Sequence, residues 1–183
     1  MSSEAITRRG VTVECVTGDI TRQSDLAAVT NAANAHLRIG GGVAGAIHRA
    51  AGPQLDEECR PLAPVSPGEA VITGAGDLPN HHVIHTLGPV YGHDRPEATL
   101  LASCYRNSLL RAEETGLTSI GFPAISTGAF GYPMADAAHV AMETIRDTLH
   151  ELQSIQLIRF VLFSDRDRQV HRRALTAAFS DSQ

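Results

Sequence analysis

The amino-acid sequence predicts a three-layer α/β domain. Short runs rich in β-branched residues alternate with segments of helical apolar periodicity, and Gly, Asn, Pro or Ser ends each strand-like run. The chain has 183 residues, of which 43% are hydrophobic and 19% charged, as in an ordinary globular domain. We therefore expect one domain over residues 1–183, with a core from about residue 11 to about residue 179 and short polar termini.

Six segments have the pattern of strands. Each is a short run of mostly apolar residues bounded by turn-forming residues, which is typical of strands that helices cover on both faces. The predicted strands are Val11–Val16, Leu26–Thr30, Ala70–Thr73, His82–Leu87, Thr118–Phe122 and Ile155–Phe163.

Helical patterns lie between these strands. The clearest runs from Pro133 to about Leu152, with proline in the first turn and apolar residues spaced three or four apart, so that one face is buried. Prolines and a glycine between Pro61 and Gly68 mark a surface loop within the domain. The other predicted helices are about Val43–Ala51, Pro53–Arg60, Glu97–Thr115 and Asp165–Phe179.

The charge balance argues against a nucleic-acid-binding surface. The chain has 15 Lys and Arg residues and 20 Asp and Glu residues, so its formal net charge is −5. This balance does not provide the positive surface that binding to nucleic-acid phosphates requires. We therefore expect no bulk nucleic-acid binding. The only cationic cluster is expected to be a solvated helix face, and consists of Arg166, Arg168, Arg172 and Arg173.

Cysteine usage and hydropathy indicate a cytoplasmic protein. Cys15, Cys59 and Cys104 are widely separated, which fits neither a disulfide framework nor a zinc site. A chain of this length buries enough surface to fold without a metal or disulfides, and we expect no cofactor. No apolar run approaches the ~18 residues of a membrane span, so we expect no membrane association.

The first informative loop combines polar amides with consecutive glycines. Asn31 and Asn34 follow a predicted strand, and Gly40–Gly42 precede the helix expected at Val43. Free backbone N–H groups and the positive end of a helix dipole favour a phosphate there. The spacing matches neither a P-loop nor a dinucleotide fingerprint. The alternative is that these glycines form only a tight turn.

A second loop of the same design spans Ser126–Pro133, between a buried strand and the long helix. Both loops follow strands and precede helices, so they could converge on one diphosphate at the carboxyl edge of a sheet. The segment Ala124–Gly128 also nearly matches the elbow of a serine hydrolase. However, Ala replaces the first glycine, and the helix begins too far after Ser126.

Other candidate residues lie outside these two loops. Asp19 sits on a turn after the first strand, either as a helix cap or as an acceptor for the exocyclic amine of adenine. His81, His82 and His85 suggest a metal, but no carboxylate or cysteine stands at ligand spacing. Two histidines that flank the first glycine loop could act as bases or merely pack against it, and these are His36 and His48.

Five motifs, in this order, resemble those of the macrodomain family. They are Gly18-Asp-Ile-Thr21, Asn31-Ala-Ala-Asn34, Gly40-Gly-Gly-Val-Ala-Gly-Ala-Ile-His-Arg-Ala-Ala-Gly52, Val83-Ile-His-Thr-Leu-Gly-Pro89 and Ile125-Ser-Thr-Gly-Ala-Phe-Gly-Tyr-Pro133. The resemblance covers about residues 11–179. It implies a three-layer α/β/α sandwich with a mixed, mostly parallel six-stranded sheet, and a cleft at the strand ends that binds ADP-ribose.

The resemblance also implies a role for each matching position. Asp19 would accept from the adenine amine, Ile20 and Phe163 would lie near the base, and Asn34 would hold the distal ribose. The glycine loops would wrap the ribose and diphosphate with backbone N–H groups. The full set of implied ligand-binding residues is Asp19, Ile20, Asn31, Asn34, Gly41, Gly42, Val43, Ser126, Thr127, Gly128, Ala129, Phe130 and Phe163.

Many macrodomains hydrolyse esters of ADP-ribose. The substrate is either a protein with mono-ADP-ribose on Asp or Glu, or O-acetyl-ADP-ribose. One catalytic branch has Asp where this chain has Ala44, and some relatives have His where it has Ile39. The resemblance then implies that Asn34 and the backbone of Gly42 position a water, which the substrate's own phosphate activates. The alternatives are a non-catalytic reader of ADP-ribose, or a binder of another nucleotide or RNA end.

Overall fold

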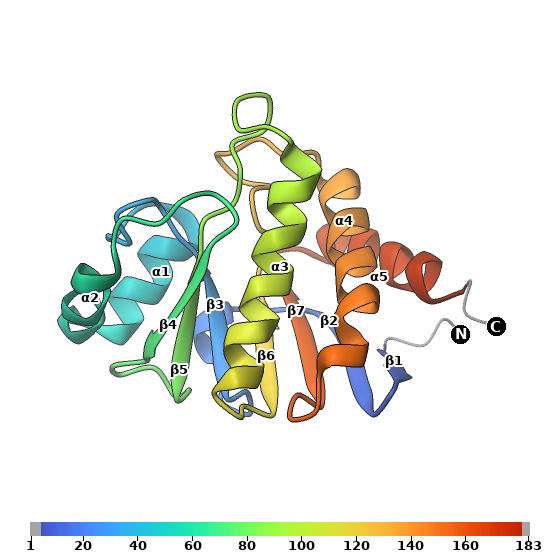
Figure 1. Ribbon diagram of the computed structural model, residues 1–183, viewed down its shortest axis with the longest axis horizontal. Helices are drawn as coiled ribbons and strands as arrows, with labels where there is room; N and C mark the ends of the chain where they lie inside the picture. Colours follow the sequence, from blue (N-terminus) through green and yellow to red (C-terminus); the bar gives the residue numbers. More distant parts are fainter. Residues whose placement is uncertain (1–4, 181–183) are drawn as a thin grey trace.

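The computed structural model of the protein describes residues 5–180 and places its strands in one twisted sheet, with the order β1-β2-β7-β6-β3-β5-β4 (Figure 1). The central strands run parallel, whereas β1 pairs antiparallel with β2 and β4 pairs antiparallel with β5. The bounds are β1 Ala5–Arg8, β2 Val11–Thr17, β3 Ala28–Ala32, β4 Ala70–Gly74, β5 His82–Thr86, β6 Ser119–Phe122 and β7 Leu157–Leu162.

The predicted α/β class and mixed, mostly parallel sheet are confirmed, but the sheet has seven strands rather than six. The additional strand is β1, which lies in the segment predicted to be a polar terminus. It forms a hairpin with β2 through Arg9 and Gly10, both with positive φ. Its single strongly apolar residue, Ile6, is too little to produce a strand pattern. The rest of the predicted polar termini, residues 1–4 and 181–183, lies outside the described residues.

The helices lie close to their predicted positions. Their bounds are α1 Gly42–Ala51, α2 Pro53–Cys59, α3 Glu97–Glu114, α4 Met134–Thr148 and α5 Asp165–Ser180. Helix α4 is shorter than predicted, because the chain tightens into a 3₁₀ turn over Leu149–Glu151. The apolar spacing continues through that turn, and Leu149 and Leu152 are buried, so periodicity alone cannot locate the end of the α-helix.

Helices cover both faces of the sheet, as a three-layer sandwich requires. Alternate residues of the strands point to opposite faces: Phe160 joins the core under α3, α4 and α5, whereas Val161 joins the core under α1 and α2. In Figure 1, α3 and α4 cross in front of the sheet, while α1 and α2 lie beside its β3–β5 side. No helix within residues 5–180 is long and apolar enough to cross a membrane.

Strand β3 begins and ends two residues later than the predicted strand, Leu26–Thr30, so Asn31 lies within the sheet. Asn31 lies beside His85 of β5, is fully buried, and its Nδ2 donates to His85 Nδ1 at 3.1 Å. The other ring nitrogen lies 2.9 Å from Thr73 Oγ1, which donates to the carbonyl of Gly74. This chain of bonds suits a neutral imidazole with its proton on Nε2. Burial accordingly lowers the pKa of His85 to about 3.

We predict that the buried His85 makes the protein sensitive to acid. The unfolded chain binds a proton below the ordinary pKa of 6.5, whereas folded His85 stays neutral down to about pH 3. The free energy of unfolding therefore falls as the pH drops from 6.5 towards 3, and His85 contributes a slope of up to about 1.4 kcal/mol per pH unit. Urea unfolding at several pH values measures this slope.

The variant His85→Gln removes the titrating group and should flatten that slope by about the stated amount. Some dependence should remain, because burial also lowers the pKa of His48 and of His171. The comparison uses slopes rather than absolute stabilities, so a general loss of stability in the variant does not affect it. Equal slopes in the wild type and the variant would show that His85 is not the acid-sensitive group.

Candidate functional site

A cleft of about 460 Å³ lies at the carboxyl ends of the parallel strands. Four of these strands are adjacent in the sheet, in the order β2-β7-β6-β3, and each contributes the segment that follows it. Residues after β2 and β7 form one end, the loop after β6 forms the middle, and residues after β3 with the start of α1 form the other end. The cleft therefore occupies the position at which open α/β sheets bind ligands.

The end of the cleft beside β2 and β7 is mainly apolar. Gly18, Ile20, Leu162 and Phe163 line it. Gly18 N donates to Leu162 O at 3.0 Å, so the turn after β2 is attached to the end of β7. The ring of Phe163 is 76% exposed, which is unusual for a large apolar side chain and provides a flat surface at the cleft mouth.

Asp19 lies between two lining residues and is held by its own turn. Its Oδ1 accepts from Thr21 N at 2.9 Å and from Thr21 Oγ1 at 2.7 Å. These hydrogen bonds lower the pKa of Asp19, so the carboxylate is ionised at neutral pH. Oδ2 has only a distant partner, Arg22 Nε at 3.9 Å. The predicted capping role is therefore seen at Oδ1, which caps the 3₁₀ turn. Oδ2 makes no closer contact within residues 5–180, and its predicted role as an acceptor for adenine stays a prediction.

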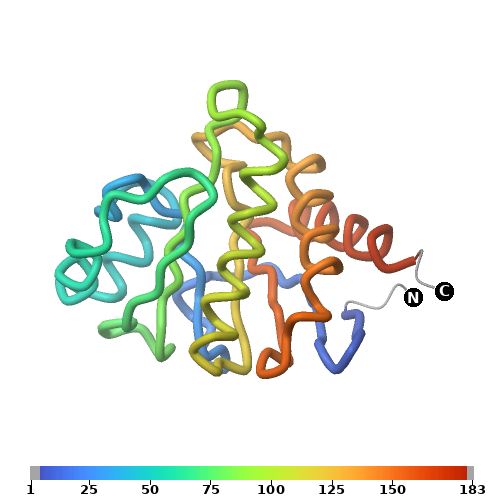
Figure 2. The backbone as a smooth tube through the Cα atoms, in the orientation of Figure 1, coloured from blue at the N-terminus to red at the C-terminus, as the bar shows by residue number. Residues whose placement is uncertain are grey.

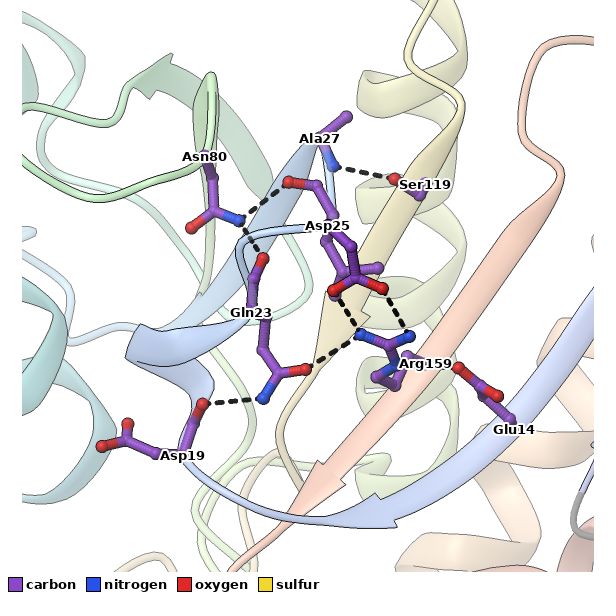
Figure 3. A network of polar contacts seen from close by, with 9 residues as sticks. Glu14, Asp19, Gln23, Asp25, Ala27, Asn80, Ser119 and Arg159 are labelled. Atoms are coloured by element: carbon purple, nitrogen blue, oxygen red, sulfur yellow. Dashed lines mark hydrogen bonds and ion pairs between the residues drawn. The ribbon is translucent and has the colours of Figure 1, made fainter.

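A polar network between β7 and the segment that follows β2 positions this turn (Figure 3). Arg159 of β7 binds both oxygens of Asp25 at 2.8 Å and donates to Gln23 Oε1 at 3.0 Å. Gln23 Nε2 in turn donates to the carbonyl of Asp19 at 2.9 Å. The ion pairs raise the pKa of Arg159 and lower that of Asp25. Through Gln23, the central strand β7 therefore fixes the backbone that carries Asp19.

The middle of the cleft is the loop after β6, which Figure 2 shows beside the loop after β5 at the top of the trace. Tyr91 N donates to Phe130 O at 2.9 Å and joins the two loops. Ser126 has φ +68°, a conformation that costs free energy in a non-glycine residue and that is typical of functional loops. Its Oγ is buried and has no hydrogen-bond partner within residues 5–180, so no histidine activates it, unlike the nucleophile of a serine hydrolase.

Both glycine-rich loops present unpaired backbone donors. Among residues 5–180, no hydrogen bond engages the N–H groups of Gly128, Ala129 and Phe130, nor those of Gly41, Gly42 and Val43. All six residues line the cleft. The second group is also the N-terminus of α1, where the helix dipole is positive. Two sets of free donors, in residues that line one cleft, have the chemistry that an anion requires.

The far end of the cleft, beside β3 and α1, contains Asn34. Its Oδ1 accepts from Arg38 N at 3.0 Å and its Nδ2 donates to Arg38 O at 2.8 Å, so the side chain closes the turn before the glycines. Gly42 has φ +56°, which favours glycine over any other residue at the first position of α1. Ala44 lines the same end without contributing a polar group.

The cleft contains almost no charge. Within the described residues 5–180, no lysine or arginine lines it, and Asp167 is the only ionisable side chain of the lining. Any anion bound there is therefore held by N–H groups and dipoles, not by cationic side chains. At the far end of the cleft, beside β3 and α1, no lining side chain within residues 5–180 could serve as a general base.

Most of the predicted ligand-binding residues come together in the cleft, and two do not. Asp19 lies beside the lining, and Asn31 is buried in the sheet against His85. The predicted residues that line the cleft are Ile20, Asn34, Gly41, Gly42, Val43, Ser126, Thr127, Gly128, Ala129, Phe130 and Phe163. Lining residues that were not predicted to bind ligand are Gly18, Ala32, Ala33, Gly40, Ala44, Pro123, Ala124, Met134, Val161, Leu162 and Asp167.

The histidines do not form part of the cleft lining. His36 is exposed, and His48 is buried on α1 with its ring centre 6.4 Å from that of His85. Burial lowers the pKa of His48, although Asp56 opposes the shift. Within residues 5–180, no three His, Cys, Asp or Glu side chains are grouped as a metal site would require.

The fold and cleft define the class of protein: an α/β sandwich with an anion-binding cleft at the carboxyl ends of its parallel strands. The family model described as Macro domain matches residues 30–141. The chain belongs to the Macro domain family.

Relatives and solved structures support this assignment along nearly the whole chain. An O-acetyl-ADP-ribose deacetylase of Klebsiella pneumoniae is 46% identical over 90% of this chain and 96% of its own. A macrodomain of Oceanobacillus iheyensis, solved with ADP, is 39% identical with a TM-score of 0.91 and covers 97% of each chain. A Trypanosoma brucei macrodomain in complex with ADP-ribose is 36% identical, with a TM-score of 0.82 over 89% of this chain and 68% of its own.

We predict that the loop after β6 depends on a close backbone contact at Gly88. A Cβ added there would overlap Ser126 Oγ and lie 2.7 Å from Ile125 Cγ2. Gly88→Ala should therefore lower the free energy of unfolding by about 1–3 kcal/mol, because the side chains of Ser126 and Ile125, or the backbone at residue 88, must move. Denaturant unfolding measures this loss. Gly128→Ala is the matched control, since open space surrounds its Cβ, and equal stability of both variants would contradict the prediction.

Proposed function

We propose that the protein binds ADP-ribose in this cleft and hydrolyses ADP-ribosyl esters, either protein-linked mono-ADP-ribose on Asp and Glu or O-acetyl-ADP-ribose. The observation that carries the proposal is the pair of loops whose free N–H groups face one cleft without a cation. A diphosphate accepts several such bonds at once. The Klebsiella O-acetyl-ADP-ribose deacetylase, and the Oceanobacillus and Trypanosoma macrodomains solved with ADP and with ADP-ribose, support the same ligand.

The order of the segments along the cleft matches the order of groups in ADP-ribose. The apolar end with Ile20 and Phe163 suits adenine, and Asp19 Oδ2 is available to its exocyclic amine. The N–H groups after β6 suit the diphosphate. The end with Asn34 and the start of α1 suits the distal ribose, to which the ester is attached. Three strand spacings of about 4.8 Å separate the two ends.

The proposed hydrolysis relies on positioning, because no ionisable side chain lines the distal end. Asn34 and the Gly42 backbone hold a water against the ester, and a phosphate oxygen of the substrate accepts its proton. The water oxygen adds to the carbonyl carbon of the ester, and the bond from that carbon to the ribose oxygen breaks. The phosphate passes the proton it accepted to the departing ribose oxygen, so the products are a carboxylic acid and a ribose hydroxyl. Orientation of this kind supplies much of the rate enhancement in enzymes that lack a basic residue.

A second candidate function is a reader that binds ADP-ribose without cleaving anything. Ala44 favours it, because an apolar methyl group lines the end at which water would be activated. Ile39 favours it as well, since its side chain is 56% exposed beside the glycines and offers no polar atom.

Two measurements on the same protein sample distinguish these functions. Calorimetric titration with ADP-ribose tests binding, and incubation with an Asp/Glu-linked ADP-ribosylated protein tests release of ADP-ribose. Binding with release above the buffer blank supports the hydrolase, binding with release equal to the blank supports the reader, and absence of binding contradicts both.

We predict that Asn34→Ala lowers turnover by about a hundredfold, in the range seen when one positioned donor is removed. Affinity for ADP-ribose should weaken by no more than about tenfold, the cost of one neutral hydrogen bond. His36→Ala is the matched control, because His36 flanks the same loop but does not line the cleft, and it should leave turnover unchanged. Unchanged turnover in Asn34→Ala would refute the role given to this residue.

We predict that Asp19 selects adenine. Asp19→Ala should weaken binding of ADP-ribose by about 10- to 100-fold, because a charge-assisted hydrogen bond to the amine is lost. Guanine has a carbonyl at that position, so GDP-ribose should bind the wild type more weakly and should not lose affinity in the variant. Titration with both ligands measures the ratio. Equal affinity of the wild type for the two ligands would contradict the assignment.

A further inference from the structure

Asp167 is the one ionisable side chain that lines the cleft in the part of the chain that the structure describes, residues 5–180, and the proposed function gives it no role. It is the third residue of α5, the helix that follows β7, and stands four residues after Phe163. Both residues line the cleft and come from the segment that forms its β2/β7 end. A half-buried carboxylate in a cleft otherwise suited to an anion requires an explanation, because it repels negative charge.

Helix capping does not account for the position of this carboxylate. Ser164 Oγ accepts from Asp167 N at 3.1 Å, as an N-cap residue does. In a capping box the acidic side chain at this helix position bonds back to the N–H of the cap. Within residues 5–180, no hydrogen bond or ion pair engages the Asp167 carboxylate, so both of its oxygens remain available to a ligand.

Asp165, two residues earlier, shows the contrasting arrangement. Its Oδ1 accepts from Thr17 Oγ1 at 2.7 Å and lies 3.6 Å from Arg168 Nη2. Its contacts therefore attach the start of α5 to the end of β2. Asp165 does not line the cleft. The two carboxylates of the first turn have the same favourable position relative to the helix dipole, so the dipole does not explain why only Asp167 faces the cleft.

The proposed order of groups along the cleft indicates what Asp167 would meet. Adenine lies at the β2/β7 end and the diphosphate at β6, so the adenosine ribose lies between them. Its 2′ and 3′ hydroxyls are donors, and a carboxylate accepts bonds from hydroxyls that are shorter and stronger than neutral ones. A carboxylate that binds a ribose diol is also a general device for distinguishing an unmodified nucleotide from its 2′-phosphate.

We propose that Asp167 recognises the adenosine ribose and restricts the cleft to ligands with a free 2′ hydroxyl, that is, to ADP-ribose and against 2′-phospho-ADP-ribose. This inference rests on the proposed binding of ADP-ribose. A 2′-phosphate carries a charge of about −1.5 to −2 at neutral pH. Among residues 5–180, no lysine or arginine lines the cleft, so Asp167 repels this phosphate without a cationic side chain of the lining to oppose it.

The test compares ADP-ribose with 2′-phospho-ADP-ribose by calorimetry, in the wild type and in two matched variants. Asp167→Asn keeps the shape and an acceptor oxygen but removes the charge. Asp165→Asn removes the same charge from the same turn, at a position outside the cleft. Adenosine 5′-monophosphate and adenosine 2′,5′-bisphosphate form a second pair of probes that lack the distal ribose.

The wild type should prefer ADP-ribose over its 2′-phosphate by at least about tenfold, a free-energy difference of about 1.4 kcal/mol. Asp167→Asn should reduce that preference by about tenfold, mainly because the 2′-phosphorylated ligand binds more tightly. Asp165→Asn should leave the preference unchanged. The pair of adenosine phosphates should show the same change, which assigns the effect to the adenosine half of the ligand.

The outcomes separate this inference from the function on which it rests. If the wild type binds neither ADP-ribose nor its 2′-phosphate, the proposed function itself fails. If ADP-ribose binds but Asp167→Asn keeps the wild-type preference, or Asp165→Asn changes it equally, the role of Asp167 is wrong while ADP-ribose binding stands.

Discussion

The parallel run β2-β7-β6-β3 is the constraint on which the rest of the molecule depends. Strands that run in one direction have all their carboxyl ends at one edge, so the segments after them must meet there. The antiparallel strands β1 and β4 lie at the two margins of the sheet and contribute no residue to the cleft. The loop after β5 contributes indirectly, because Gly88 packs closely against Ser126. One topological feature thus sets both the position and the internal order of the site.

Polar side chains of the strands and of the turn after β2 maintain this arrangement. Asn31 and His85 join β3 to β5 at the strand ends, next to the loop that carries Asn34. On the other side, Arg159 of β7 holds Gln23, and Gln23 holds the Asp19 turn. The two ends of the cleft are therefore attached to the sheet by different means: a neutral hydrogen-bond chain on one side and an ion-pair network on the other.

The sequence predicted the local features of the molecule better than the long-range ones. Glycines before a helix have a local physical meaning, and the predicted residues of both glycine-rich loops line the cleft, with the exception of Asn31. Strand β1 was missed because its stability comes from pairing with β2, not from its own composition. The resemblance assigned Asn31 to the ligand, and the predicted strand ended at Thr30, two residues before the end of β3, so its burial in the sheet was not expected. Asp167 has no local signal that separates it from Asp165, since only tertiary structure decides which one faces the cleft.

A cleft that holds an anion without cationic side chains has a consequence for its behaviour in a cell crowded with ATP, other free nucleotides and RNA. Cationic pockets attract every polyanion over long distances, because Coulomb attraction depends little on shape. Backbone N–H groups exert force only over hydrogen-bond distances and in fixed directions. The two glycine-rich loops therefore select a ligand by its shape and by the positions of its acceptor atoms rather than by its charge. In a protein of net charge −5, such a cleft can remain unoccupied in the presence of abundant phosphates and bind only a molecule of complementary shape.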